Sequence, residues 1–426
     1  MIKNIEHSRI SDRDQQVIWH PYTQNHWGQY SIGISYAEGS YIFDDEGNRY
    51  IDAISSWWVN LHGHCHPFMI KSVLEQMTRI DHVIFAGFTH EPAVQLAEKI
   101  LAVLPRNQSK VFFSDDGSTA VEVGVKMAIQ YWVNKGIPKK KILAWKNSYH
   151  GDTFGSMSLS GRGPFNAAFN PYLFEVEFLE IPKNVHEVQN LVQNLSDDFA
   201  AFIFEPLIQG ASGMRMYKAD VLNQIITACK SRGILTIADE VMTGFGRTGK
   251  LFAMDYVIEK PDIICLSKGL TGGMLPMGLT TCTEEIFEAF QGEDTLKSFF
   301  HGHSYTANPL ACTAALASLE LLLRRSTQES IARIENQHKK FILKLGTHPR
   351  LLSIQSLGTI LSMEWKVKGG TSYFSDLRDK LYQYFLSEGI LLRPLGNILY
   401  IMPPYCISTE DLEFIYERIM DALEKF

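Results

Sequence analysis

Two charged side chains at the ends of apolar runs are the residues best suited to chemistry. Asp239 follows the run ILTIA, Lys268 follows the run IICLS, and the glycine-rich segment GFGRTGK lies between them at 244–250. Ligands of open α/β sheets bind at the carboxyl ends of the strands, so we expect both groups to face one crevice. A lysine there, with its pKa lowered by burial and by a neighbouring cation, is an amine nucleophile and a proton carrier.

An aldehyde cofactor such as pyridoxal phosphate needs this pair of groups. Lys268 would carry the aldehyde as a Schiff base, and Asp239 would keep the pyridine nitrogen protonated so that the ring can take up electrons. For one Asp and one Lys alone, a structural ion pair or two solvated loop ends would be the better interpretation. The glycines of GFGRTG and SKGLTGG favour a ligand site, because glycine lets the backbone approach a ligand closely.

Two polar turns add candidate ligand groups. SDDGST at 114–119 leads into a helical pattern, and N–H groups at a helix N-terminus can hold a phosphate, although most such turns bind nothing. NSYHGDT at 147–153 places Tyr149 at a strand end, where its ring can stack on a flat cofactor. The second turn can equally be a buried structural turn, and we expect His150 to be structural.

Short apolar runs alternate with helical patterns, which predicts an α/β fold with a mainly parallel sheet. We expect Ser118 to cap an amphipathic helix between the first two runs. From about residue 310, long helical patterns, short strands and a final amphipathic helix predict a smaller α+β domain. The five runs, which suit strands covered on both faces, are 111–114, 142–145, 201–206, 234–240 and 263–268.

The length of 426 residues exceeds what one hydrophobic core usually serves, so we expect two tightly packed lobes. The predicted division is a segment 1–60 that joins the small domain and the substrate pocket, a large cofactor-binding domain 61–310, and a small domain 311–426.

The composition excludes several classes of partner. A net charge of -7 gives no reason to expect nucleic acid or anionic lipid. The six cysteines are scattered singly and predict reduced thiols, with no metal site. The N-terminus has no apolar signal core and no later run is long enough to span a membrane, which predicts a cytoplasmic protein.

The motifs resemble those of class III aminotransferases of the fold-type I pyridoxal-phosphate family. ADEVMTGFGRTGKLFA, LSKGLTGG and YHGDT match in order and spacing, and the resemblance runs from about residue 19 to the C-terminus. It implies pyridoxal 5'-phosphate as cofactor. Gly117 and Ser118 would hold the phosphate, Tyr149 would stack on the ring, Asp239 would hold the pyridinium and Lys268 would form the Schiff base.

Narrower motifs resemble the branch of that family that converts 8-amino-7-oxononanoate to 7,8-diaminononanoate in biotin biosynthesis by a ping-pong cycle. These are WHPYTQ at 19–24, SSWW at 55–58 before HGH, QGASGMRMY at 209–217 and LRPLG at 392–396.

The resemblance to that branch implies a substrate pocket lined by Tyr22, Trp57, Tyr149 and Tyr400, with Tyr22 also taking part in catalysis. Arg393 would take the carboxylate, since its planar fork suits that group and a long aliphatic acid needs an apolar channel with a cation at its end. The alternatives are a surface arginine and core tryptophans, and we expect one of Trp57 and Trp58 to be core.

The family also implies a homodimer with shared active sites. The loop HGHSYT at 301–306 would reach the partner, with Gly302 near the substrate and Ser304 near the phosphate. Some members have proline and threonine where this chain has His303 and Ser304. LTGGMLPMGLT resembles the branch in which lysine donates the amine, whereas Tyr22 and Arg247 suit S-adenosylmethionine, the predicted donor.

Three other functions are compatible with parts of this pattern. Another class III transaminase would act on an ω-amino acid or a polyamine, which the WHPYTQ and SSWW segments disfavour. An aminomutase or decarboxylase on the same scaffold would release no keto product. A non-enzymatic cofactor-binding protein would not need Asp239, Lys268 and the phosphate turn together.

Overall fold

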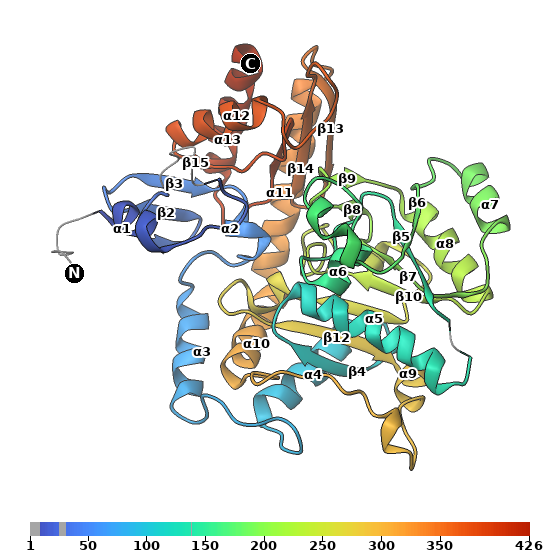
Figure 1. Cartoon of the computed structure of the whole chain (residues 1–426). Coiled ribbons are helices and arrows are strands. Elements are labelled where there is room, and N and C mark those ends of the chain that lie inside the picture. The colour runs from blue at the N-terminus through green and yellow to red at the C-terminus, as the bar shows by residue number, and fades with distance from the viewer. Residues whose placement is uncertain (1–8, 25–30, 138) are drawn as a thin grey trace.

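A seven-stranded sheet forms the centre of the larger part of the molecule, and the described residues also form three smaller sheets of four, three and two strands (Figure 1). The computed structural model describes residues 9–24, 31–137 and 139–426. Neighbouring strands of the large sheet are parallel except where β12 pairs antiparallel with both of its neighbours. The mainly parallel sheet is therefore confirmed. Its strands, in spatial order, are β4 (Gln108–Ser114), β12 (Gly278–Thr283), β11 (Ile263–Leu266), β10 (Leu235–Asp239), β7 (Phe199–Phe204), β5 (Lys141–Trp145) and β6 (Glu177–Leu179).

Both faces of this sheet are buried, as the apolar runs predict. In β5, Ile142 and Ala144 join the hydrophobic cluster that includes α5 (Gly117–Asn134), whereas Leu143 and Trp145 join the larger cluster on the other face. Successive side chains of a strand point to opposite faces, so a run without polar residues requires cover on both sides. Helix α8 (Ala219–Ser231) belongs to the second face.

Helix α5 begins two residues earlier than expected. Its N-cap is Asp116, whose carboxylate accepts a hydrogen bond from Thr119 N at 2.8 Å, while Thr119 Oγ1 accepts from Asp116 N at 3.0 Å. The prediction that Ser118 caps the helix is wrong, because this reciprocal box is already complete at Asp116. Ser118 lies in the first turn instead, where its backbone N–H points out of the helix end.

Other elements surround the large sheet. β8 (Ile208–Gln209) and β9 (Arg215–Met216) form a hairpin beyond the end of β7. The remaining helices of this part are α3 (Pro67–Met77), α4 (Glu91–Val103), α6 (Phe154–Leu159), α7 (Val185–Gln193), α9 (Glu284–Glu288) and α10 (Pro309–Leu323), with short 3-10 turns η2 (Ala167–Tyr172), η3 (Ala253–Tyr256), η4 (Lys268–Thr271) and η5 (Thr295–Lys297).

The two ends of the chain build the smaller part together. Strand β3 pairs in parallel with β15, so the N-terminal strands (blue) lie beside the C-terminal helices (red) in Figure 1. The division at residues 60 and 310 stays a prediction, although α10 packs against α3 and α4 and so lies with the large sheet. The elements of this part are α1 (Ile10–Val17), β1 (Ile34–Glu38), β2 (Tyr41–Asp44), β3 (Arg49–Asp52), α2 (Ser55–Trp58), α11 (Arg325–Leu345), β13 (Leu351–Leu357), β14 (Ile360–Trp365), α12 (Leu377–Ser387), β15 (Ile390–Leu391), β16 (Ile398–Ile401) and α13 (Thr409–Lys425).

The structure also describes the cysteines and the apolar length of the helices. All six cysteines are free thiols, and four of them are buried. Among the described residues, no helix is long and apolar enough to span a membrane.

Candidate active site

A cavity of about 610 Å³ opens at the carboxyl ends of β5, β7, β10 and β11. Five of the residues singled out from the sequence line it together: Gly117, Ser118, Tyr149, Asp239 and Lys268. They lie at or after the ends of four strands, β4, β5, β10 and β11, which the sheet topology brings to one edge.

Lys268 is the first residue of η4, directly after β11, with a left-handed backbone (φ 45°). Its ammonium nitrogen lies 4.8 Å from the centre of the Trp58 ring, and it has no hydrogen bond or ion pair with any described residue. Burial lowers the pKa of the amine, Asp239 and Glu205 act against this shift, and Arg247 adds to it. A lysine with these surroundings is a stronger nucleophile than a solvated one.

Asp239 is buried at the end of β10 and is held by its neighbours rather than by Lys268. Its Oδ2 lies 2.7 Å from His150 Nδ1, and its Oδ1 accepts a hydrogen bond from Val241 N at 3.1 Å. His150 therefore orients the carboxylate, and its other ring nitrogen, Nε2, is buried and has no hydrogen-bond partner among the described residues. The interpretation of Asp239 and Lys268 as a mutual structural ion pair is not supported by this geometry.

A second buried carboxyl group, Glu205, lies in the same wall directly after β7. It accepts hydrogen bonds from Tyr149 N and Gly210 N, each at 2.9 Å. Burial and the nearby Asp239 raise the pKa of Glu205 to about 8, although the two backbone hydrogen bonds act in the opposite direction. This carboxyl group ties the Tyr149 turn to the segment that follows β8.

The N-terminus of α5 fits a phosphate group. The N–H groups of Gly117 and Ser118 have no acceptor among the described residues, and both residues line the cavity. A side chain at position 117 would put its Cβ 2.7 Å from Val241 Cγ1, so only glycine leaves this approach open. The residues present therefore suit pyridoxal phosphate: amide donors for the phosphate, Asp239 for the ring nitrogen and Lys268 for the aldehyde.

Tyr149 and Tyr22 lie on the way into the cavity. Tyr22 donates a hydrogen bond to Asp152 Oδ2 at 2.6 Å, and burial and this carboxylate raise its pKa to about 12. Burial and Asp152 also raise the pKa of Tyr149. Both phenols thus stay protonated near neutral pH and can donate hydrogen bonds.

Two consecutive tryptophans, Trp57 and Trp58, lie between the cavity and the Arg393 side chain. Trp58 is 5% exposed and lines the cavity beside Lys268. Trp57 is 41% exposed and packs edge-on against Tyr22. The guanidinium carbon of Arg393 lies 4.5 Å from the centre of the Trp57 ring. Arg393 lines an adjoining cavity and has no ion pair or hydrogen bond with any described residue. Its positive charge is therefore available for a ligand.

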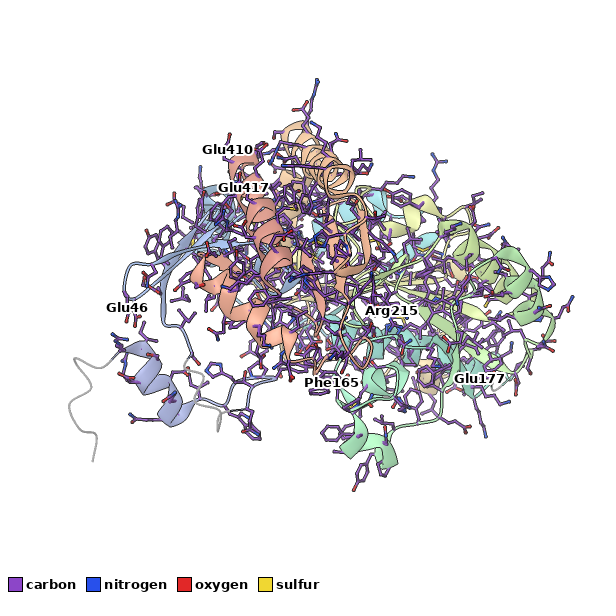
Figure 2. All side chains as sticks on the ribbon, turned by 90° about the horizontal axis from the view of Figure 1, so that it is seen from above. Glu46, Phe165, Glu177, Arg215, Glu410 and Glu417 are labelled. Carbon is purple, nitrogen blue, oxygen red and sulfur yellow. The ribbon has the colours of Figure 1, made fainter. Side chains whose placement is uncertain are left out.

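An aromatic cluster closes this entrance from the other side. The Phe165 ring lies 4.7 Å from Tyr373 and 5.6 Å from Phe374, centre to centre, where the segment after α6 meets the C-terminal part (Figure 2). Tyr22 packs edge-on against the same Phe165 ring.

Seven of the predicted residues do not line this cavity. Tyr22 and Arg393 line another cavity instead, and Trp57 packs between their side chains. The other four lie elsewhere. Arg247 is 1% exposed, and its guanidinium donates to the carbonyls of Pro403, Trp58 and Asn60, so its hydrogen bonds go to backbone. Tyr400 is fully buried behind Trp58, from whose Nε1 it accepts a hydrogen bond at 2.9 Å. Gly302 and Ser304 are exposed and lie outside the cavity of their own chain.

Among the cavity residues for which the sequence predicted no role are Asp152 and Glu205. Glu205 follows an apolar run in the same way as Asp239, so the rule that found one carboxylate could have found the other. One of Trp57 and Trp58 was expected to be a core residue; Trp58 is the buried one, and it also lines the cavity.

Comparisons with known proteins agree with this arrangement. Residues 22–423 match the family model "Aminotransferase class-III". An adenosylmethionine-8-amino-7-oxononanoate aminotransferase from Synechococcus elongatus is 44% identical over 420 residues, which cover 96% of this chain and 98% of the relative. The crystal structure of the enzyme of that name from Methanocaldococcus jannaschii has a TM-score of 0.92 at 35% identity, covering 97% and 98% of the two chains.

Similar folds with other described activities are also found. The omega transaminase from Pseudomonas jessenii in complex with PMP has a TM-score of 0.91 at 28% identity and covers 98% of each chain. With the family model matching almost the whole length and the cavity residues suited to the cofactor, the chain belongs to the class III aminotransferases, which are pyridoxal-phosphate-dependent enzymes.

Proposed function

We propose that this enzyme transfers an amino group to 8-amino-7-oxononanoate and releases 7,8-diaminononanoate, a step of biotin biosynthesis. The observation that carries the proposal is the series Lys268, Trp58, Trp57 and Arg393, in which two aromatic rings lie between an amine and a guanidinium that has no ion pair with the described part of the chain. A keto acid with several methylene groups between its carbonyl and its carboxylate matches such a series. The names of the relatives from S. elongatus and M. jannaschii support the same substrate.

We assign the cofactor contacts to the residues that converge on the cavity. Gly117 and Ser118 hold the phosphate, Tyr149 covers the ring, Asp239 holds the pyridine nitrogen and Lys268 holds the aldehyde carbon. Pyridoxal phosphate, when bound, supplies a carbonyl that condenses with amines and a ring that takes up the electrons left when a substrate carbon loses its proton.

The protein positions groups and moves a proton. Once an incoming amine has released it, Lys268 Nζ would take the proton from the substrate carbon and give it to the aldehyde-derived carbon of the cofactor. The lowered pKa of the amine assists this transfer. His150 keeps the Asp239 carboxylate aimed into the cavity. Trp58 and Tyr149 shield the reacting region from water.

The substrate-binding roles follow from charge and position. Arg393 takes the carboxylate of the keto acid in bidentate fashion, while Trp57 and Tyr22 flank its chain. Asp152, which lines the cavity, offers an anion to the ammonium group of 8-amino-7-oxononanoate. Tyr400 and Arg247 act by holding Trp58 in place. The Tyr400 hydroxyl accepts a hydrogen bond from the Trp58 side chain, and the Arg247 guanidinium donates one to the Trp58 carbonyl.

Both half-reactions use the same Lys268 amine, so we expect ping-pong kinetics. S-adenosylmethionine is the proposed donor and lysine the alternative.

We further infer a homodimer in the cytoplasm. Exposed apolar side chains at 83–88 lie next to the loop that carries Gly302 and Ser304: the His82 and Tyr305 rings are 5.1 Å apart, and Phe88 and Phe300 are 66% and 70% exposed. A second copy covering this surface would bring the loop to a neighbouring active site. Six free thiols suit a reducing compartment.

The acceptor half-reaction tests this function. The protein is loaded with pyridoxamine phosphate and mixed with 8-amino-7-oxononanoate, and we expect 7,8-diaminononanoate by mass spectrometry together with the return of visible absorbance. S-adenosylmethionine and lysine are then compared as donors. Replacing Arg393→Met should lower kcat/KM for the keto acid by roughly 10²-fold, whereas hexanal, which has no carboxylate, should react at nearly the original rate.

If hexanal and simple keto acids restore the absorbance but 8-amino-7-oxononanoate does not, the enzyme is a general ω-transaminase and the proposed substrate is wrong.

A further inference from the structure

The segment that carries both tryptophans has a strained backbone. Three of its four residues, Ser55, Ser56 and Trp58, have positive φ values of 53°, 60° and 68°, and Ser56 combines its φ with a ψ of -87°. Residues other than glycine adopt such angles only where the surrounding structure holds them there, and such strain gathers at functional sites.

One buried carboxylate holds the middle of this segment. Asp52, at the end of β3, is completely buried, and its Oδ2 accepts hydrogen bonds from Ser56 N at 2.7 Å and from His64 Nε2 at 2.9 Å. Its Oδ1 accepts from Ile54 N at 3.2 Å. The amide of the most strained residue is therefore satisfied by Asp52.

His64 is itself fixed to the small sheet. Its backbone exchanges two hydrogen bonds with Gly39, at 2.7 and 3.2 Å. Asp52 and His64 together thus connect the strained segment to Gly39, which lies between β1 and β2 of the small sheet. Other contacts hold the ends of the segment: Ser55 Oγ donates to Met402 O at 2.8 Å.

The consequence lies at the tryptophan rings. Because Trp57 and Trp58 are consecutive, the turn at Ser56 decides how far apart their rings lie, one under Arg393 and the other beside Lys268. The turn therefore sets the relative position of the two rings, one of which lies against the amine and the other against the guanidinium.

We propose that Asp52, together with His64, is a positioning residue that sets the spacing between Lys268 and Arg393 and thereby selects the length of the carboxylate-bearing acceptor. This inference rests on the proposed function, since it takes Arg393 as the carboxylate site. Neither residue touches the acceptor, and both act through the backbone of the Ser55–Trp58 segment.

A second buried carboxylate in the same sheet offers a matched control. Asp44 in β2 is 6% exposed and also accepts several hydrogen bonds, from Glu46 N, Asn48 and the Tyr50 hydroxyl. These partners form a local turn without contact to the tryptophans, so Asp44→Asn perturbs the sheet but not the spacing.

The experiment compares two acceptors in wild-type, Asp52→Asn, His64→Gln and Asp44→Asn proteins. For each, kcat/KM is measured with 8-amino-7-oxononanoate and with hexanal, and their ratio is formed. A loss of folded protein lowers both values equally and leaves the ratio unchanged. A displaced Trp57 spoils only the acceptor that must reach Lys268 and Arg393 at once, so we expect the ratio to fall about tenfold or more in Asp52→Asn.

His64→Gln should lower the ratio in the same direction by a smaller factor, and it provides the test if Asp52→Asn does not fold. Asp44→Asn should keep the wild-type ratio within about twofold. The near-ultraviolet circular dichroism of the cofactor-free proteins should show altered tryptophan bands in Asp52→Asn and not in Asp44→Asn.

An unchanged ratio in both Asp52→Asn and His64→Gln, with unchanged tryptophan bands, would overturn the positioning role. Failure of the proposed substrate gives a different pattern, because wild-type protein itself would then not use 8-amino-7-oxononanoate. In that case the ratio is formed with whichever keto carboxylate the wild-type enzyme accepts, and the same comparison of variants applies.

Discussion

Four influences determine the protonation of the Lys268 amine. Burial lowers its pKa, Asp239 and Glu205 raise it, and Arg247 lowers it again. The net shift is downward, so the neutral, nucleophilic form of the amine is more accessible than for a solvated lysine. The carboxyl groups differ in their own surroundings, because Asp239 has His150 as a partner whereas Glu205 has only backbone donors.

Replacing Lys268→Ala should separate binding from chemistry. The proposed contacts to the phosphate and the ring nitrogen remain, so the variant should still retain pyridoxal phosphate through gel filtration. Turnover should fall by about 10²- to 10⁴-fold, as expected when a general acid and base is removed. Lys260→Ala is the control, since this lysine is also partly buried but donates to the carbonyls of Met254 and Val257. Turnover near the wild-type rate in Lys268→Ala would refute its assigned role.

Glu205 should make stability fall as pH rises. Its pKa is about 8 in the folded protein and 4.5 as a free side chain, so between these values the folded state keeps a proton that the unfolded state has lost. Unfolding is therefore favoured as pH increases through this window. In Glu205→Gln this contribution disappears, and the difference in free energy of unfolding, variant minus wild type, should rise by roughly 2–5 kcal/mol from pH 4.5 to 8.

The slope is the informative quantity in that measurement, made by urea unfolding at several pH values. Glutamine leaves one backbone N–H without an acceptor, which costs about 1–3 kcal/mol at every pH. Parallel curves for the two proteins would show that Glu205 ionises normally.

Helices from distant parts of the chain are joined by buried polar contacts as well as by apolar packing. His338 of α11 is completely buried, and its Nδ1 lies 2.7 Å from the Tyr416 hydroxyl of α13. Its Nε2 lies 3.1 Å from the carbonyl of Thr359, just before β14. One imidazole therefore connects three elements of the C-terminal part.

His338 should make this part sensitive to acid. Burial lowers its pKa to about 4 from 6.5, so below pH 6.5 the unfolded state gains a proton that the folded state refuses. The stabilisation is complete above pH 6.5 and is lost as pH falls towards 4. His338→Gln can keep both hydrogen bonds without titrating, so we expect it to lose about 2–3 kcal/mol less stability than wild type between pH 6.5 and 4.

Thermal unfolding followed by circular dichroism across that pH range measures the effect. His348→Gln, in the loop before β13, is the control, because this residue lies near Glu424 at 3.8 Å rather than in the core. Equal acid sensitivity of wild type and His338→Gln would contradict the assignment.

At the level of the whole molecule, the large sheet supplies Lys268 and Asp239, and the smaller part supplies Arg393 and both tryptophans. In the proposed function the acceptor is therefore held between the large sheet and a region built from both ends of the chain. The loop at 301–306 does not reach the cavity of its own chain, which is why a second copy enters the proposed function.

Shared active sites predict complementation between inactive subunits. Lys268→Ala lacks the amine, and Gly302→Glu would place a charged side chain in the loop proposed to serve the partner. In a hybrid dimer, one site combines an intact Lys268 with an intact loop. Random mixing by co-expression should therefore restore about a quarter of wild-type activity per subunit pair. Activity no higher than the mean of the two separate variants would indicate self-contained sites or another assembly.

Much of the site could be predicted from sequence because its residues mark strand ends. Apolar runs identify buried strands, parallel strands end at one edge, and the polar residues that follow them must meet there. This reasoning located Asp239, Lys268, Tyr149 and the turn at Gly117. It depends on local patterns alone, so it also placed five of the seven strands of the large sheet and missed β12 and β6.

The remaining features depend on contacts between distant residues. Arg247 is hydrogen-bonded to Asn60, 187 residues away, which directs its charge to backbone carbonyls instead of the cavity. The helix cap moved from Ser118 to Asp116 because a neighbouring threonine completes the capping box. The different surroundings of Trp57 and Trp58 follow from a strained turn held by Asp52. Periodicity cannot reveal these arrangements, because a buried polar group is satisfied by whichever partner the tertiary structure brings within reach.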